Sequence, residues 1–354
     1  MKRLSVLLMS LMACFFIVSC SENDDEHSGD IKVDLKSMCY VLNSGDVKSN
    51  NSSLTAFNRS TGETVQNYFK YQNKGRGLGN TANDMVAYGS KMYIAVAGES
   101  TIEVTSLDAK SIKQIKCDAK SQPRYLTVHG GKVYVTLFDG YVARIDTASL
   151  RVEAKVKVGR NPEQLIAYKD KIYVANSGGM DFDTSLGYDN TVSVIDIASF
   201  EEIRKIEVVV NPASVIAADG GVFVASYGNY ADVPSTLQFI SEDGGVNVVG
   251  QCRNMTEICW SDGVLYGYFS QYDADWNATI TYMSYNPSAK TVDSPWIKED
   301  FLPTPYKVCA AGEYVCVTSS DYINDGDVYM YDRNGILHFK VASGLNPVKV
   351  ISLN

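Results

Sequence analysis

The sequence predicts an all-β fold, a seven-bladed β-propeller of four-stranded antiparallel blades whose ring is closed by the C-terminal strand joining the N-terminal blade. Three observations predict it. A short aromatic strand recurs seven times, a second strand with a proline opening precedes most copies, and the C-terminus carries one further opening strand alone. Self-similarity at a fixed period indicates units that stack on one another to bury a shared core.

The aromatic strand is the clearest repeat. Its copies recur about every 46 residues, a spacing in the range of four-stranded propeller blades. Seven such periods account for the length of residues 33–354. The seven copies lie at 38–41, 91–95, 132–136, 171–175, 221–225, 264–267 and 314–318.

The other strands of each blade follow from the same repeat. Opening strands are expected at 122–126, 161–165, 211–215 and 304–308, each with proline at its second residue. Proline is tolerated at a strand start, where no ladder N–H is needed. Third strands are expected at 141–146 and 191–196, and a fourth strand at 202–206.

The two ends of the repeat complement each other. Residues 346–352 read as an opening strand with no aromatic strand after it, whereas the body of the chain begins with the aromatic strand at Tyr40. We therefore expect the last strand to complete the first blade, which removes free sheet edges and ties down both ends. An open stack or a pair of sandwiches is the competing architecture.

The first residues indicate a targeting signal. Lys2 and Arg3 precede an apolar run at 4–18 that is too short to span a membrane. Residues 17–20, which end in Cys20, resemble the lipobox of bacterial lipoproteins, which implies a signal peptide at 1–19 and lipidation of Cys20. A plain secretory signal is the alternative.

The segment after Cys20 is strongly acidic. Residues 21–30 hold five acidic and no basic residues, a composition that predicts a solvated tether within 20–36 ahead of a propeller at 37–354. Such an acidic stretch resembles the export signal of surface lipoproteins, so we expect an outer-membrane, lipid-anchored protein that faces the cell exterior.

Composition excludes several function classes. The net charge of −9 argues against nucleic-acid binding, and only three histidines leave little room for a histidine-rich metal site or a Ser-His-Asp triad. Six cysteines remain after the anchor and have no CxxC spacing, so zinc is not indicated; disulfides and buried free thiols both stay open. These cysteines are Cys39, Cys117, Cys252, Cys259, Cys309 and Cys316.

Five long loops between second and third strands should lie together on one face of the ring. They span 43–53, 176–190, 227–236, 269–279 and 319–327, and carry ten Asp, one Lys and eight aromatic residues. Long loops are where binding residues concentrate, and we expect the ligand site in the last four. The candidate ligand-binding residues are Asn176, Tyr188, Tyr227, Tyr230, Tyr272, Asp273, Asp275, Trp276, Asp321 and Tyr322.

Turn formation is the alternative role for each of these acidic residues, since Asp, Asn and Gly commonly form turns. Trp276 is harder to explain in that way because it stands in mid-loop among polar residues. Weaker candidates for calcium ligands are present without the EF-hand pattern. They are Asp181, Asp183, Asp325 and Asp327.

Three stretches carry a family resemblance. Residues 40–45, 172–179 and 188–196 resemble the YncE-like propeller lipoproteins of gut Bacteroidetes, often labelled surface-layer-like, and within them most of all the BtuG-type propellers that capture vitamin B12. The resemblance implies a non-enzymatic surface protein that needs no cofactor, binds cobalamin or another corrinoid on one face, and passes it to a TonB-dependent outer-membrane transporter. The rival functions are a binder of glycan or host protein, a propeller lyase or hydrolase, and a structural surface protein.

Overall fold

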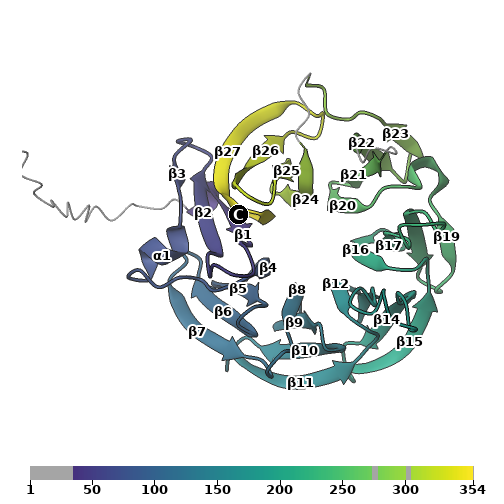
Figure 1. Ribbon diagram of the computed structural model, residues 1–354, viewed down its shortest axis with the longest axis horizontal. Helices are drawn as coiled ribbons and strands as arrows, with labels where there is room; N and C mark the ends of the chain where they lie inside the picture. The colour runs from purple at the N-terminus through teal and green to yellow at the C-terminus, as the bar shows by residue number, and fades with distance from the viewer. Residues whose placement is uncertain (1–34, 273–277, 300–303, 354) are drawn as a thin grey trace, which may run out of the picture. The chain divides into compact units, whose positions relative to one another are not determined.

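The computed structural model describes residues 35–272, 278–299 and 304–353, and these residues form seven four-stranded antiparallel sheets. Figure 1 shows the sheets arranged as blades in a ring, each with its first strand toward the centre. The predicted seven-bladed β-propeller is therefore confirmed. Within the described residues, no helix is long and apolar enough to cross a membrane.

The strands of the first four blades are given from the centre outward. Blade 1 contains β28 (Pro347–Ser352), β1 (Met38–Asn43), β2 (Ser53–Asn58) and β3 (Thr64–Val65). Blade 2 contains β4 (Ala82–Tyr88), β5 (Lys91–Val96), β6 (Thr101–Ser106) and β7 (Ser111–Lys116). Blade 3 contains β8 (Pro123–His129), β9 (Lys132–Leu137), β10 (Tyr141–Asp146) and β11 (Arg151–Lys157). Blade 4 contains β12 (Pro162–Tyr168), β13 (Lys171–Asn176), β14 (Thr191–Asp196) and β15 (Glu201–Glu207).

The last three blades follow the same plan. Blade 5 contains β16 (Pro212–Ala218), β17 (Gly221–Ser226), β18 (Thr236–Ser241) and β19 (Val246–Val248). Blade 6 contains β20 (Glu257–Ser261), β21 (Val264–Tyr272), β22 (Ala278–Asn286) and β23 (Thr291–Asp293). Blade 7 contains β24 (Pro305–Ala311), β25 (Tyr314–Ser319), β26 (Asp325–Tyr331) and β27 (Leu337–Leu345). Short helices lie between blades and at the start: η1 (Leu35–Ser37), α1 (Tyr68–Gln72) and η2 (Gly250–Cys252).

The ring closes as expected from the two ends of the repeat. The C-terminal strand β28 pairs antiparallel with β1, and Tyr40 lies opposite Ile351. Each innermost strand contacts the innermost strand of the next blade around the whole circle. Without β28, blade 1 would have three strands and the inner edge of β1 would be unpaired.

The hydrophobic core lies between neighbouring blades. Tyr93 and Val104 of blade 2 pack with Val135 of blade 3, and equivalent clusters join the other blades. Because blades cover both faces of each second strand, β5 and β9 are almost continuously buried. Burying a Val or Ile side chain contributes about 1.5–3 kcal/mol, so these interfaces hold the ring together.

Each opening strand starts with the same backbone geometry. In several blades the residue just before the opening strand has a left-handed backbone conformation, with φ of 44° at Asn161, 60° at Asn211 and 56° at Asn346. The carbonyl of this residue accepts a bond from the chain just after the second strand, as between Ser177 N and Asn161 O at 3.3 Å. A register shift follows in the opening strands of blades 1–5 and 7. The shift is a β-bulge, in which the opening strand carries one extra residue just after its start.

Two loop boundaries differ from the sequence prediction. The strands of blade 6 run to Tyr272 and resume at Ala278, so the expected loop 269–279 is shorter than predicted. Asp325 and Asp327 belong to strand β26 rather than to the loop 319–327. In blade 6 aromatic and β-branched residues such as Tyr268, Phe269 and Ile280 extend the pairing of β21 with β22. In blade 7 the extension comes from pairing with the long outer strand β27, where Asp325 lies opposite Leu345.

The cysteines of the described region are free thiols. Five of them are buried, and Cys117 is half-buried. Cys309 and Cys316 lie directly opposite each other on β24 and β25 without forming a disulfide. They pack as small apolar residues in the core, one of the two alternatives that the sequence left open.

Candidate functional site

The innermost strands place one polar side chain per blade at the same level of the central channel. Each of these residues directly precedes a buried core residue of its strand, such as Val215 after Ser214 or Val308 after Lys307. We call this set the channel ring. It consists of Lys349, Asp84, Tyr125, Gln164, Ser214, Glu257 and Lys307, from blade 1 to blade 7.

Several members of the channel ring link neighbouring blades. Lys349 Nζ lies 3.2 Å from Asp84 Oδ1, while Asp84 Oδ2 accepts a 2.9 Å hydrogen bond from the backbone of Leu126. Gln164 Oε1 accepts a bond of 3.0 Å from the backbone of Val215. The ring is therefore part of what holds the blades in register as well as a polar lining.

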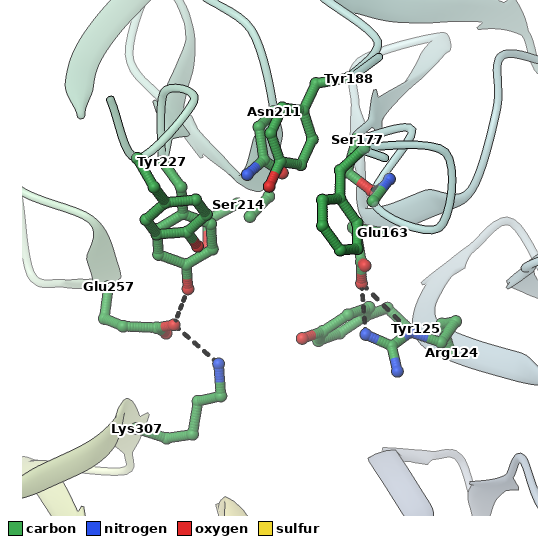
Figure 2. A pocket seen from close by; sticks show the side chains of 14 residues that line it. Arg124, Tyr125, Glu163, Ser177, Tyr188, Asn211, Ser214, Tyr227, Glu257 and Lys307 are labelled. Carbon is green, nitrogen blue, oxygen red and sulfur yellow. Dashed lines mark hydrogen bonds and ion pairs between the residues drawn. The ribbon is translucent and has the colours of Figure 1, made fainter. Parts of the chain in front are cut away.

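A cavity of about 330 Å³ opens from this ring toward the loops of blades 4 and 5. Figure 2 shows two ion pairs facing each other across it. On one side Arg124 donates from Nε (3.1 Å) and Nη2 (2.7 Å) to Glu163 Oε2. On the other side Lys307 Nζ lies 2.7 Å from Glu257 Oε1.

The second ion pair extends to a tyrosine. The Tyr227 hydroxyl donates a hydrogen bond to Glu257 Oε1, the oxygen that also accepts from Lys307. Burial and the Glu257 carboxylate raise the pKa of Tyr227 well above its usual range. Burial lowers the pKa of the Lys307 ammonium, but Glu257 outweighs this effect and the pKa lies well above its usual range. Both groups therefore keep their protons at neutral pH.

Four aromatic side chains form a continuous wall beside the cavity, which we call the aromatic rim. Phe182 stacks on Tyr188 with ring centroids 6.1 Å apart, and Tyr188 contacts Tyr230 at 6.3 Å. Tyr230 stacks in turn on Tyr227 at 6.3 Å. Phe182 is 59% exposed and Tyr230 is 73% exposed, so the outer part of the rim offers ring faces to solvent.

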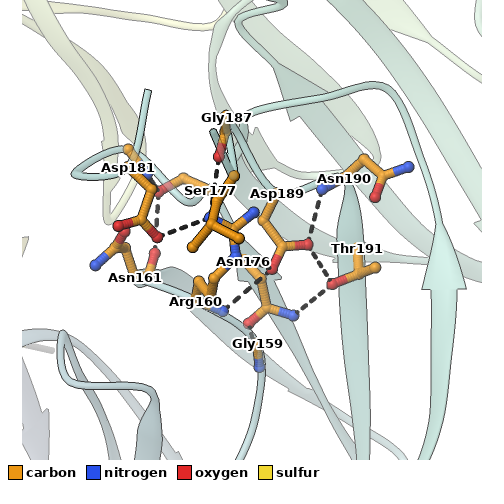
Figure 3. Close-up of polar contacts among 12 residues, drawn as sticks. Gly159, Arg160, Asn161, Asn176, Ser177, Asp181, Gly187, Asp189, Asn190 and Thr191 are labelled. Atoms are coloured by element: carbon orange, nitrogen blue, oxygen red, sulfur yellow. Dashed lines mark hydrogen bonds and ion pairs between the residues drawn. The ribbon is translucent and has the colours of Figure 1, made fainter. Parts of the chain in front are cut away.

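A polar network holds the blade 4 loop that carries Phe182 and Tyr188 of this rim (Figure 3). Arg160 Nη1 lies 2.7 Å from Asp181 and donates at 2.9 Å to the carbonyl of Gly187. Asp189 accepts from the backbone of Arg160 and from the hydroxyl of Thr191. Tyr188 stands between Gly187 and Asp189 and is therefore anchored on both sides.

The structure brings three of the predicted ligand residues together. Tyr188, Tyr227 and Tyr230 all line the cavity. Asp321 and Tyr322 lie on the loop of blade 7 and do not line it: Asp321 accepts backbone bonds from Ile323 and Asn324, and Tyr322 packs on Tyr306 at 5.4 Å. Asp273, Asp275 and Trp276, and the side chain of Tyr272, lie outside the described residues.

Asn176 is placed inside the fold rather than at the cavity. Its side chain is fully buried and donates to the hydroxyls of Thr191 (3.0 Å) and Ser193 (2.8 Å). Its Oδ1 accepts from the backbone of Gly159 at 3.2 Å. Asn43 bonds two hydroxyls of blade 1 in the same way, so the Asn-Ser-Gly sequence at the end of both strands is a structural motif.

Two of the four aspartates considered as calcium ligands are paired with cations, and the other two are exposed. Asp181 pairs with Arg160, and Asp327 lies 3.1 Å from Lys340 Nζ. Asp183 and Asp325 are exposed. Across the described residues there is no group of three or more His, Cys, Asp or Glu side chains arranged to hold a metal ion.

Sequence reasoning missed the charged half of the cavity. Arg124, Glu163 and Lys307 occupy the one or two positions after the proline of their opening strands. The same positions in blade 5 hold Ala213 and Ser214, so the charged residues stood out within the repeat itself. The sequence alone does not show that these strand positions face the channel, so the charged residues could not be assigned to a site from it.

Comparison with solved structures supports the fold. The chain resembles Kuenenia stuttgartiensis hydrazine synthase with a TM-score of 0.60 and 16% identity, over 74% of this chain and 86% of that one. It also resembles the computationally designed Ika8 protein with a TM-score of 0.55 and 11% identity, over 85% of this chain and 86% of that one. At these identities the likeness concerns the fold alone.

Sequence comparison assigns a family. No curated protein matches the chain significantly. The family model described as "Domain of unknown function (DUF5074)" matches residues 37–249, which span blades 1 to 5 apart from β28. Arg124, Glu163 and the aromatic rim lie within this match, whereas Glu257 and Lys307 follow it. The chain belongs to the DUF5074 family.

Proposed function

We propose that this protein is a non-enzymatic ligand-binding propeller that captures a corrinoid on its loop face. The observation that carries the proposal is the aromatic rim standing directly beside a polar cavity. A corrinoid has a flat, largely apolar ring edged by amide groups. Aromatic side chains match the faces of such a ring, and a small number of converging polar groups match its edge.

The size of the cavity sets how a corrinoid would bind. About 330 Å³ accepts one edge of the macrocycle with its amide groups, but not the whole molecule. The remainder would rest against Phe182 and Tyr230, whose exposed rings extend beyond the cavity. This arrangement is that of a capture surface rather than an enclosed reaction chamber.

The protonation states also favour binding over catalysis. A general acid or base works best with a pKa near the operating pH. Tyr227 and Lys307 both have pKa values raised well above their usual ranges, and Glu257 and Glu163 are each engaged with a cation. The groups around the cavity are thus matched to hydrogen bonding.

The cellular setting is part of the same proposal. Lipidation at Cys20 and the acidic segment 21–30 would tether the propeller to the outer membrane, facing the exterior. A captured corrinoid would then be passed to a TonB-dependent outer-membrane transporter as the partner. The proposed affiliation with the YncE-like propellers, and with the BtuG-type in particular, rests on the three sequence stretches named above.

Calorimetry of residues 31–354 with cyanocobalamin tests the proposal, because the closed ring lies entirely within that segment. We expect saturable binding with one ligand per chain. Absence of binding heat at micromolar protein would remove the corrinoid from consideration.

A glycan is the second candidate ligand. The exposed faces of Phe182 and Tyr230 favour it, because sugar rings stack on such faces as well as corrins do. A glycan array probed with the same segment distinguishes the two ligands, since a corrinoid-capturing protein should leave the array unlabelled.

A further inference from the structure

The charged residues that line the cavity balance one another. Arg124 and Lys307 supply two positive charges, and Glu163 and Glu257 supply two negative charges. Each cation is directly paired with one carboxylate, and each carboxylate is only slightly exposed, 13% for Glu163 and 11% for Glu257. The cavity therefore offers no uncompensated charge to a ligand.

In both ion pairs a single oxygen of the carboxylate accepts all of the hydrogen bonds. Arg124 directs two N–H groups to the same oxygen, Oε2 of Glu163. Tyr227 and Lys307 likewise both donate to one oxygen, Oε1 of Glu257. Among the described residues, Glu163 Oε1 and Glu257 Oε2 accept no hydrogen bond. An ammonium has three donors and a guanidinium has five, so Lys307 and Arg124 also retain N–H groups for a ligand.

We infer that the cavity takes neutral primary-amide groups of its ligand and discriminates against carboxylates. This inference rests on the proposed corrinoid binding and names the part of the ligand that the cavity recognises. A primary amide donates two hydrogen bonds and accepts two, so it can bind an open carboxylate oxygen and an open N–H of the same ion pair.

A carboxylate in the same place would be disfavoured. It only accepts hydrogen bonds, so it would leave the open oxygens of Glu163 and Glu257 without donors and would face them as like charges. It would also lose its hydration on entering the cavity without meeting a free cation in return. The Tyr125 and Ser214 hydroxyls beside the ion pairs are neutral and do not alter this balance.

The test compares cyanocobalamin with its separated derivatives in which a single peripheral propionamide has been hydrolysed to propionate. Binding of each to residues 31–354 is measured by calorimetry at pH 7.5. At least one derivative is expected to bind about 10-fold or more weakly than cyanocobalamin, because its carboxylate would replace the amide held in the cavity.

A charge-changing variant makes the test specific to the cavity. Glu163→Gln gives the lining a net positive charge, and it should reduce the amide-over-acid preference at least about 3-fold. The matched control is Glu153→Gln, which removes a carboxylate paired with Lys132 at 2.7 Å on the outer strand of blade 3 and should leave the preference unchanged. Thermal unfolding of each variant confirms that the ring is intact.

The outcomes separate the two proposals. If cyanocobalamin binds and every hydrolysed derivative binds as tightly, the amide inference is overturned while corrinoid capture stands. The same holds if Glu163→Gln leaves the preference of a folded protein unaltered. If cyanocobalamin itself does not bind, the proposed function fails and the inference falls with it.

Discussion

Lys307 and Glu257, from the innermost strands of blades 7 and 6, form an ion pair with 2.7 Å between Nζ and Oε1, and Tyr227 of blade 5 donates to the same oxygen. Three consecutive blades are thus joined at one carboxylate. The contact has two consequences. It stabilises the ring at this level of the channel, and it fixes the hydroxyl end of an aromatic rim residue.

Removing the cation of this pair should destabilise the fold. In Lys307→Met, the largely buried Glu257 would lose its charge partner, and we expect the free energy of unfolding to fall by about 1–3 kcal/mol. Lys340→Met is the matched control, because Lys340 pairs with Asp327 at 3.1 Å while 54% exposed, and it should cost less than about 1 kcal/mol. Urea unfolding measures both. Equal losses would contradict a special role for the buried pair.

The fold followed from the sequence because propeller blades repeat. Tyr40, Tyr93 and Tyr134 mark the same position of three second strands, and each is almost fully buried in the structure. The Asn-Pro openings likewise marked the start of the innermost strands. A repeat of this kind reports local structure and neighbour packing together, so both the strands and the ring closure were predictable.

The composition of the candidate site was predictable only in part. Tyr188, Tyr227 and Tyr230 stood out as aromatics in long loops, and the structure gathers them. Asn176 was predicted to be the first residue of an exposed loop, but it is the last residue of β13 and its side chain points inward. A difference of one residue in the end of the strand decides between these two placements. Arg124 was overlooked because the sequence alone does not show that its strand position faces the channel.

Alkaline pH should weaken the fold through its buried thiols. Burial raises the pKa of Cys252 to about 12, whereas an unfolded thiol titrates near about 8.5. The folded pKa is the higher one, so this contribution is fully present below about pH 8.5 and is lost as the pH rises toward about 12. In Cys252→Ala the free energy of unfolding should fall less steeply over that range. Urea midpoints from pH 8 to 10.5 measure the slopes, and parallel curves for the two proteins would refute the assignment.

The buried amide of Asn176 should matter for stability. Asn176→Ala removes two donors and one acceptor from the interior and leaves Ser193 without its partner, so we expect a loss of about 1–3 kcal/mol. The exposed Asn190 in the same loop provides the control, and Asn190→Ala should change stability by less than about 0.5 kcal/mol. Thermal and urea unfolding give the comparison. If Asn176→Ala lowered ligand affinity and left stability intact, the residue would instead belong to the binding site.

The aromatic rim should carry much of the binding energy. Tyr230→Ala and Phe182→Ala each remove a ring that is more than half exposed beside the cavity, and each should weaken cyanocobalamin binding by about 1–3 kcal/mol. Tyr322→Ala is a close control, because Tyr322 is 68% exposed on a loop of the same face but packs on Tyr306 and does not line the cavity. Calorimetry of the three variants shows whether binding depends on the position of the ring beside the cavity or only on its exposure to solvent. Equal losses in all three would show that the ligand covers the whole face, whereas a loss confined to Tyr322→Ala would move the site to blade 7.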